Sequence, residues 1–237
     1  GETWVHGTPV QAYFHGQTIF DKPFQSQVPG LTDFQLHYAL NEALMKPQSW
    51  TGGVAKIYYT LAKDYIYTDP NQNVIFLDNH DLSRFYGSVE QDFNKFKMGI
   101  AFLMTTRGIP NLYYGTELLQ AELSDRHSGT VRTDFPGGWP SDPLNKFTAR
   151  DRSAKENEAF DYIRKLANWR KNNTAIHTGK LMQFVPEDDV YVYFRYNDEQ
   201  SVMVIMNNND RDIKLETERF NERLDGFTVL KNVITEE

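Results

Sequence analysis

Short apolar runs alternate with longer stretches of helical periodicity through the middle of the chain. Residues 74–77 read Val-Ile-Phe-Leu without interruption, and four polar residues follow at once. A strand that is apolar on both faces is typical of a parallel sheet covered by helices. Apolar residues then recur at helical spacing over 93–104, with Asp92 as the expected N-cap and Gly108 as the expected C′ residue, before another apolar run at 109–114. The order strand, helix, strand predicts a βαβ unit.

The segments on either side of this unit carry weaker signals. Residues 31–36 form a weaker strand candidate, followed by a helical pattern that is interrupted near 47–53. Residues 121–150 are rich in Gly, Pro, Asp, Ser and Arg and show no period, and a stretch of that length is usually functional or disordered. Ser153 and Glu156 match a capping box, which predicts a helix over the apolar stripe that follows.

The pattern changes after Asn172. Three short β-rich segments, 181–185, 190–196 and 201–206, are separated by turn-like polar clusters. They predict an antiparallel all-β domain with a boundary near 173–180. The fold class predicted from the pattern is therefore α/β followed by all-β, and no internal repeat is visible.

Composition and charge narrow the classes of function. The 237 residues include 13 Tyr, 16 Phe and 4 Trp, whose rings suit sugar faces, although core filling is the commoner use of aromatic residues. A net charge of −7 without a Lys/Arg cluster argues against a nucleic-acid partner. There is no Cys, and no apolar run approaches the roughly 18 residues of a membrane span, so we expect neither a disulfide nor a membrane partner. With no initiator Met before Gly1, the chain reads as a piece of a longer one.

Polar residues at the ends of the predicted strands are the first candidates for chemistry. In parallel βα units, functional side chains gather at the carboxyl edge of the sheet. The Asp-Asn-His-Asp run at 78–81 lies at such an edge, and Glu2 joins it if residue 1 closes a strand. Two carboxylates there suit glycoside hydrolysis, in which one protonates the leaving oxygen and another manages the oxocarbenium-like charge. From the residues alone, a polar turn or a helix N-cap is the more frequent use of such a run.

Three motifs, in order, resemble those of the α-amylase superfamily of glycoside hydrolases. Gly1–Trp4 is similar to the strand-5 motif, Phe76–Asp81 to the strand-7 motif with its Asn-His-Asp, and Gly108–Glu117 to the eighth strand. The resemblance covers essentially the whole chain. It implies the second half of a TIM (β/α)8 barrel, strands 5–8, in residues 1–175. An antiparallel β-sandwich domain follows in residues 176–237, which looks too short to be complete.

The resemblance also implies catalytic roles. Glu2 would be the general acid/base, and Asp81 the carboxylate that stabilises the transition state. His80 would hydrogen-bond sugar hydroxyls beside the cleaved bond; a capping or buried His is the alternative. A retaining mechanism further needs a nucleophilic carboxylate about 5 Å from the acid. In the family this is an Asp at the end of the fourth strand, before Gly1 in this chain, so we expect the isolated 237-residue chain not to hydrolyse α-glucans.

Five further residues are candidates for contact with a substrate. Trp4 would line the sugar cleft or lie in the rim or core, and Arg84 would orient a carboxylate or pair with a surface acid. The segment Asp-Phe-Pro-Gly-Gly-Trp at 134–139 is similar to a loop of cyclomaltodextrinase- and neopullulanase-like members. That resemblance places Arg132, Asp134 and Trp139 at the substrate cleft, and a self-packed Ω-loop is the alternative.

Partners follow from the family resemblance. It implies α-glucan oligosaccharides such as cyclodextrins, pullulan and maltooligosaccharides. The alternatives are a transglycosylase or α-glucosidase of the same superfamily, or a non-catalytic amylase-like protein used in binding or assembly. The combination of Glu2, His80 and Asp81 argues against the non-catalytic alternative.

Cofactors and further partners are also expected from the resemblance. We expect no cofactor and no metal from this chain, although family members bind calcium through regions outside it. The other barrel half or a second copy of the chain would cover the open sheet edges of half a barrel. The resemblance favours a periplasmic or secreted location and leaves a cytoplasmic one open.

Overall fold

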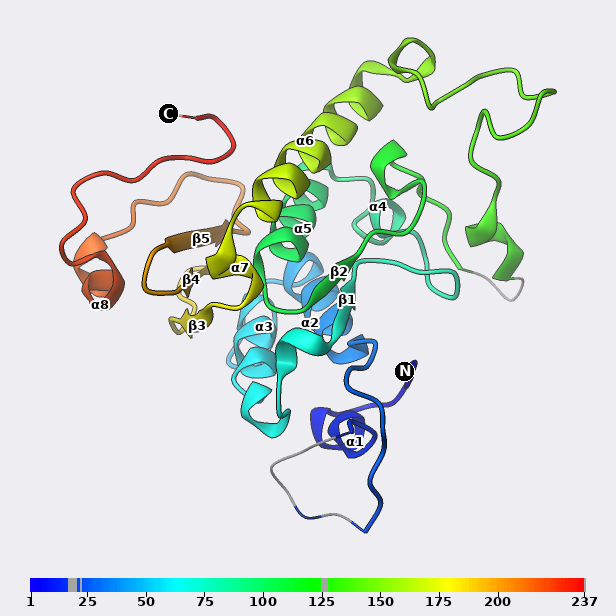
Figure 1. Ribbon diagram of the computed structural model, residues 1–237. Coiled ribbons are helices and arrows are strands. Elements are labelled where there is room, and N and C mark those ends of the chain that lie inside the picture. The colour runs from blue at the N-terminus through cyan, green and yellow to red at the C-terminus, as the bar shows by residue number, and fades with distance from the viewer. Residues whose placement is uncertain (17–20, 22, 125–127, 237) are drawn as a thin grey trace.

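The computed structural model describes residues 1–16, 21, 23–124 and 128–236 (Figure 1). The helices are α1 Thr8–Tyr13, α2 Phe34–Met45, α3 Val54–Leu61, α4 Phe85–Ser88, α5 Phe93–Thr105, α6 Ala154–Lys171, α7 Thr174–His177 and α8 Asn221–Leu224. The strands are β1 Val74–Phe76, β2 Ile109–Asn111, β3 Lys180–Gln183, β4 Val190–Tyr196 and β5 Ser201–Asn207. None of the described helices is both long and apolar enough to cross a bilayer.

The predicted βαβ unit is confirmed. β1 and β2 pair in parallel, with Val74 opposite Ile109 and Phe76 opposite Asn111, and α5 connects them. The side chain of Asp92 accepts hydrogen bonds from the backbone N–H groups of Asn94 and Lys95, at 2.8 and 3.0 Å, as an N-cap does. The connection places the polar residues after β1 beside the segment that follows β2.

Backbone hydrogen bonds extend this pair to four segments that run side by side. The N–H of Thr32 donates to the carbonyl of Gly1 at 3.0 Å, and the N–H of Val74 donates to that of Leu31 at 2.8 Å. On the far side, the N–H of Ile109 donates to the carbonyl of Asn73 at 2.8 Å. The segments therefore follow one another in the order in which consecutive barrel units would, and their assignment to strands 5–8 stays a prediction.

The expected strand at 31–36 is wrong. Only Thr32 forms a β-bridge, with Val74, and helix α2 already begins at Phe34. The physical reason is Asp33, whose side chain accepts a hydrogen bond from the N–H of Leu36 at 3.0 Å and starts the helix two residues after the bridge.

The second apolar run, 109–114, is also different from the expected buried strand. β2 covers only its first three residues, and Ile109 is 50% exposed. Gly108 is not the C′ residue, because α5 is capped by Thr106. It has φ +105°, and a Cβ there would lie 2.8 Å from the carbonyl oxygen of Asn73. A glycine is thus required where the chain turns into β2.

Helix α6 and the three-stranded sheet agree with their predictions. The capping box of α6 is present, with Ser153 N–H donating to Glu156 at 2.7 Å and Glu156 N–H donating to Ser153 Oγ at 3.2 Å. β3, β4 and β5 form an antiparallel sheet in sequence order. After β5, the described residues contain only a 3-10 turn and the short helix α8. Of the predicted sandwich, the described part of the chain therefore contains the three strands β3, β4 and β5.

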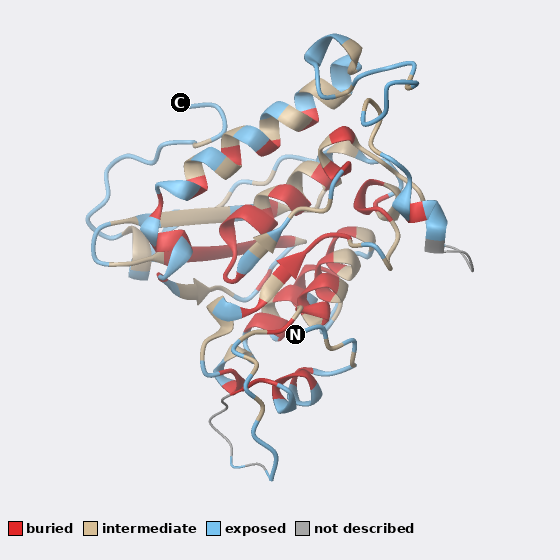
Figure 2. Cartoon of the chain, turned by 45° about the vertical axis from the view of Figure 1, so that its right-hand side comes forward, coloured by how far each residue is buried: buried red, intermediate tan, exposed pale blue. Residues whose placement is uncertain are grey.

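Strand β4 is buried on both faces (Figure 2). Tyr191 and Tyr193 pack into the main core with helices α2, α3, α5 and α6, and the Tyr193 hydroxyl lies 2.6 Å from Thr105 Oγ1. Val192 and Phe194 face the other way, onto Phe220 from the segment after the sheet. The sheet is therefore fixed to the helices of the α/β part by one face and covered by the C-terminal segment on the other.

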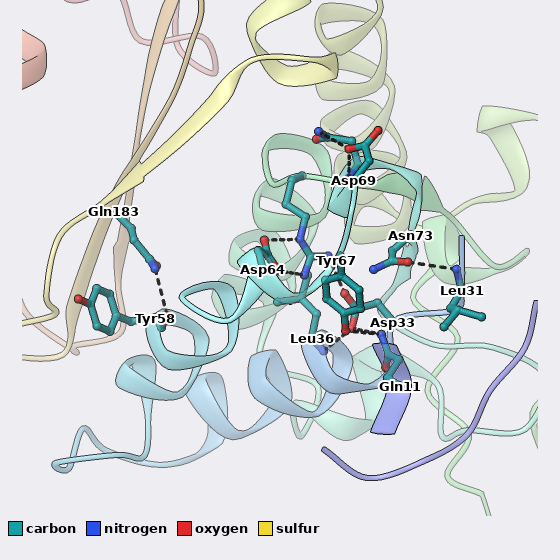
Figure 3. A network of polar contacts seen from close by, with 12 residues as sticks. Gln11, Leu31, Asp33, Leu36, Tyr58, Asp64, Tyr67, Asp69, Asn73 and Gln183 are labelled. Atoms are coloured by element: carbon teal, nitrogen blue, oxygen red, sulfur yellow. Dashed lines mark hydrogen bonds and ion pairs between the residues drawn. The ribbon is translucent and has the colours of Figure 1, made fainter. Parts of the chain in front are cut away.

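A buried ion cluster, which we call the Arg107 cluster, lies beneath these segments and was not predicted. Arg107 donates to Asp33 at 2.6 Å and to the two oxygens of Asp64 at 2.6 and 2.7 Å. Gln11 donates to the Tyr67 hydroxyl at 2.9 Å and to Asp33 at 3.2 Å, and Figure 3 shows these side chains turned toward one another. Burial raises the pKa of Asp64, and the Arg107 guanidinium opposes that rise. The cluster ties α1, α2 and the start of β2 together.

His37 on α2 predicts a pH-dependent stability. It is 9% exposed and stacks on Phe76, and burial lowers its pKa to about 4 although hydrogen bonds to the backbone of Leu77 and Phe76 oppose that shift. Because the folded pKa lies below the unfolded value of 6.5, His37 contributes stability above pH 6.5 that is lost as the pH falls toward 4. We expect the free energy of unfolding to fall by roughly 3 kcal/mol when this contribution of His37 is lost completely.

The measurement is urea unfolding at pH 7 and pH 4.5. His37→Gln should remove most of this pH dependence, whereas His177→Gln, an exposed position at the end of α7, should keep it. If the unfolding free energy changed equally between pH 7 and pH 4.5 in the His37→Gln variant and in the unaltered chain, the assignment to His37 would be contradicted.

Candidate active site

The loop after β1 is anchored by Asp78, which is 2% exposed. Its carboxylate accepts hydrogen bonds from the N–H of Phe85, the first residue of α4, at 2.9 Å and from Thr116 Oγ1 at 2.9 Å. The Arg84 guanidinium lies 3.8 Å away. Burial raises the pKa of Asp78, while the bond from Phe85 and the charge of Arg84 act against that rise. Asp78 therefore holds the loops after β1 and β2 against each other.

Asp81, His80 and Arg132 come together above this anchor. Arg132 donates to Asp81 Oδ1 at 2.7 Å and to the backbone carbonyl of His80 at 2.7 Å, and His80 Nε2 lies 3.2 Å from Asp81 Oδ2. The side chains of Asp81 and Arg132 are 31% and 43% exposed. A carboxylate that is held on one side and open on the other can face the positive charge of a bound ligand.

The polar-turn reading of the Asp-Asn-His-Asp run is therefore correct for its first half. Asn79 accepts the N–H of Asp81 at 2.9 Å and closes the turn, and Asp78 anchors it. Asp81 and His80 do not perform this structural task, and their side chains point to the surface, where His80 is 50% exposed. The run thus divides between structure and a site.

Glu2 and Trp4 belong to the first of the four side-by-side segments. Glu2 is exposed, and its carboxylate has no hydrogen bond or ion pair among the described residues. The ring of Trp4 stacks on Phe34 at 4.9 Å, and its indole N–H donates to the Tyr38 hydroxyl at 2.5 Å. Trp4 is half exposed and so belongs to the rim. Among the described contacts, Glu2 is not joined to Asp81.

Arg84 is not available to a ligand. Its side chain is 0% exposed, its guanidinium lies 4.3 Å from the ring centre of Tyr113, and it donates to Gln120 at 2.6 Å and to the carbonyl of Tyr114. The predicted contact with substrate is therefore wrong for Arg84. Burial between Asp78 and the segment after β2 is the cause, and orienting a carboxylate is the alternative that the structure supports.

Hydrogen bonds between its own residues hold the segment 128–150 together. Asp134 accepts the indole N–H of Trp139 at 3.0 Å, and Asp142 accepts the backbone N–H groups of Gly137 and Trp139 at 2.7 and 3.1 Å. Trp139 nonetheless remains 60% exposed. The segment has the internal ties of an Ω-loop, while one aromatic face and Arg132 at its start stay at the surface.

Sequence reasoning placed Arg132 at the cleft but did not predict its bond to Asp81, and it missed Thr116. Thr116 and Arg132 reach the loop after β1 from 38 and 51 residues away along the chain. For Thr116 the one available signal was its place within the Gly108–Glu117 motif. Within the described part of the chain, no group of three or more His, Cys, Asp or Glu side chains is arranged to hold a metal ion.

Comparison with known families identifies the fold. The model of the α-amylase catalytic domain matches residues 21–203, and the cyclo-malto-dextrinase C-terminal domain matches residues 181–237. The chain belongs to the α-amylase family. This is the superfamily that the three motifs resembled, and an α-amylase catalytic part followed by a domain with an antiparallel sheet fits a partial TIM barrel with a sandwich domain.

Relatives of this α-amylase family chain include two cyclomaltodextrin glucanotransferases. That of Thermoanaerobacterium thermosulfurigenes is 30% identical over 179 residues, and that of Geobacillus stearothermophilus 32% over 178 residues. The alignments cover 76% and 75% of this chain and 22% of each relative. The chain therefore spans about a fifth of the length of these curated relatives.

Solved structures show the same fold. The α-amylase from Geobacillus thermoleovorans in complex with acarbose matches with a TM-score of 0.68 at 22% identity. The match covers 92% of this chain and 44% of the amylase chain. The three-domain cyclomaltodextrin glucanotransferase CldA has a TM-score of 0.60 at 29% identity, with coverage of 87% and 38%. The arrangement of helices and strands is thus that of the family.

Proposed function

We propose that this chain is part of a retaining enzyme that acts on α-1,4-linked glucans. The observation that carries the proposal is Asp81, a carboxylate in the loop after β1 that is held by Arg132 and His80 and open on its other side. Membership of the α-amylase family supports it, as do the Gly1–Trp4 and Phe76–Asp81 motifs. Acarbose and maltose are named as bound in similar structures.

In this proposal Glu2 is the general acid/base, and Asp81 stabilises the oxocarbenium-like transition state. Arg132 fixes the direction of the Asp81 carboxylate, because it also bonds the backbone of His80. His80 would bond sugar hydroxyls, and the half-exposed rings of Trp4 and Trp139 would lie along the sugar. A bound glucan would have to place one glycosidic bond within reach of both Glu2 and Asp81.

A retaining mechanism passes through a covalent glycosyl-enzyme intermediate, and two ways of releasing the sugar from it are candidates. Attack by water gives hydrolysis, which is supported by the match of the cyclo-malto-dextrinase C-terminal domain and by the 134–139 loop. Attack by a sugar hydroxyl gives transglycosylation, which is supported by relatives of at least 30% identity with the name cyclomaltodextrin glucanotransferase. We favour hydrolysis of cyclodextrins, pullulan and short maltooligosaccharides.

The test is product analysis with the full-length product of the gene that encodes this chain. We expect linear maltooligosaccharides from β-cyclodextrin and reducing ends from pullulan. Cyclic products from starch would instead identify the transglycosylase. Absence of any turnover by a folded protein would contradict both and leave the non-catalytic alternative.

We further propose that the 237-residue chain by itself does not turn over α-glucans, since the family resemblance assigns the nucleophile to a strand outside it. A covering partner, either further barrel units or a second copy, is proposed because β2 leaves a half-exposed edge. Intact mass and co-purifying chains test the partner. A metal or other cofactor is not part of the proposal for these residues.

A further inference from the structure

A hollow of about 540 Å³ lies between the loop after α2 and the turn joining β3 to β4, away from the candidate active site. In both views the three-stranded sheet and the segment 128–150 lie on opposite sides of β1 and β2 (Figures 1 and 2). None of the residues that line the hollow belongs to the Asp81, His80 and Arg132 group. Its volume falls within the range of about 300–1,000 Å³ usual for ligand pockets.

Aromatic residues form one wall. Trp50 is 89% exposed, an unusual state for the largest apolar side chain, and Tyr59 beside it is 37% exposed. Trp50 lies in a closed turn, in which Ser49 N–H donates to the carbonyl of Gly52 at 3.2 Å and Gly52 N–H donates to Ser49 Oγ at 2.9 Å. Gly53 has φ +61°, and a Cβ there would lie 2.6 Å from the carbonyl oxygen of Pro47. The ring is thus held in water on a fixed backbone.

The polar wall is fixed as firmly. Gln48 N–H donates to Asp189 at 2.7 Å, Asp189 N–H donates to Gln48 Oε1 at 2.8 Å, and Gln48 Nε2 donates to the carbonyl of Pro186 at 2.9 Å. These bonds join positions 138 to 141 residues apart. Beside them, Gln183 of β3 donates to the carbonyl of Tyr58 on α3 at 3.2 Å (Figure 3). These bonds therefore hold the aromatic wall and the polar wall at a fixed distance from each other, without the help of a ligand.

The hairpin turn presents a carboxylate to the hollow. Asp188 and Asp189 both have positive φ, at 50° and 56°, between the bridged residues Glu187 and Val190, as in a two-residue type I′ turn. The Asp188 carboxylate and the Arg211 guanidinium are exposed at its rim and have no hydrogen bond or ion pair within the described ranges. Each would be available to an incoming ligand.

These groups select a neutral, polyhydroxylated ligand. Asp188 and Asp189 would repel an anion, and one arginine is too little for a phosphate backbone. Hydroxyl groups can donate to the carboxylates and accept from the guanidinium at the same time. The C–H face of a pyranose ring fits an exposed indole, which otherwise remains in water.

We infer that this hollow is a second oligosaccharide-binding site, in which a maltooligosaccharide lies across Trp50 and Tyr59 with its hydroxyls on Asp188 and Arg211. The choice of an α-linked glucan rests on the proposed function, whereas the sugar class rests on the hollow itself. Such a site holds a polymeric substrate without taking part in bond cleavage.

The experiment is ¹⁹F NMR on the full-length gene product with its tryptophans replaced by 5-fluorotryptophan, in which the variants Trp50→Phe and Trp139→Phe assign the resonances of Trp50 and Trp139. Titration with maltohexaose should shift the Trp50 resonance to saturation. Arg211→Ala and Asp188→Ala should each weaken that binding about tenfold, since each removes a hydrogen bond to a charged group. Arg164→Ala, an exposed arginine on α6, should leave it unchanged.

The Trp139 resonance reports the candidate active site separately. Saturation at Trp50 without a response at Trp139 supports the second site and counts against the proposed function. A response at Trp139 alone, or at neither ring, overturns the second site. An equal response to cellohexaose overturns its assignment to α-glucans, and an unchanged affinity in both hollow variants overturns the placement of the sugar.

Discussion

Asp81→Asn in the full-length gene product should lower kcat about 10³-fold and leave KM within a factor of a few, because the lost charge acts mainly in the transition state. Asn has nearly the same shape as Asp and can still accept a hydrogen bond from Arg132, which bonds Asp81 at 2.7 Å. The loop should therefore stay in place, since its anchor is Asp78 and not Asp81. The measurement is steady-state kinetics with β-cyclodextrin.

Two further variants serve as controls for Asp81→Asn. Asp198→Asn removes an exposed acid in the turn between β4 and β5 and should keep the parental kcat. Arg132→Ala leaves the Asp81 charge but frees its direction, so we expect a smaller loss of kcat than in Asp81→Asn. A kcat of Asp81→Asn within tenfold of the parent would remove Asp81 from the catalytic assignment.

The fold was readable from sequence wherever a local signal decides the structure. The N-cap at Asp92 and the capping box at Ser153 each bond to residues two or three positions away, so the pattern contains all of the information. Asp33 carries the same kind of signal but stands inside the segment 31–36, in which polar and apolar residues are mixed and which also suits a weak strand. There the cap determined the structure, and the predicted strand became a bridge followed by a helix.

The site was readable in part, for a related reason. The motif around Asp81 is contiguous, whereas its partner Arg132 comes from 51 residues further along the chain. The burial of Arg84 depends on Asp78, Tyr113 and Gln120, which only the folded chain brings together. A charged residue one turn from a carboxylate reads the same in sequence whether it faces a ligand or supports the loop from below.

Arg107→Ala should lower the free energy of unfolding by about 3–5 kcal/mol, because it leaves the two acids of the Arg107 cluster without their counter-charge. The exposed fractions of Arg107, Asp33 and Asp64 are 2%, 1% and 15%, so water cannot replace the guanidinium. The measurement is urea unfolding of the 237-residue chain at pH 7. The triple variant Arg107→Met, Asp33→Asn, Asp64→Asn should recover part of the loss, since no unpaired charge remains and the asparagine side chain introduced before α2 can still cap that helix.

The sign of the pH dependence separates this electrostatic loss from a loss of packing. Without Arg107 the pKa of Asp64, which burial already raises, loses the charge that opposes the rise. A carboxyl group whose folded pKa lies above its unfolded value contributes stability at low pH that is lost as the pH rises through the folded pKa. The deficit of Arg107→Ala relative to the parent should therefore be smaller at pH 5 than at pH 8. His37 titrates in both proteins and cancels in the difference, so a deficit that is equal at the two pH values would mean that Arg107 acts by packing alone.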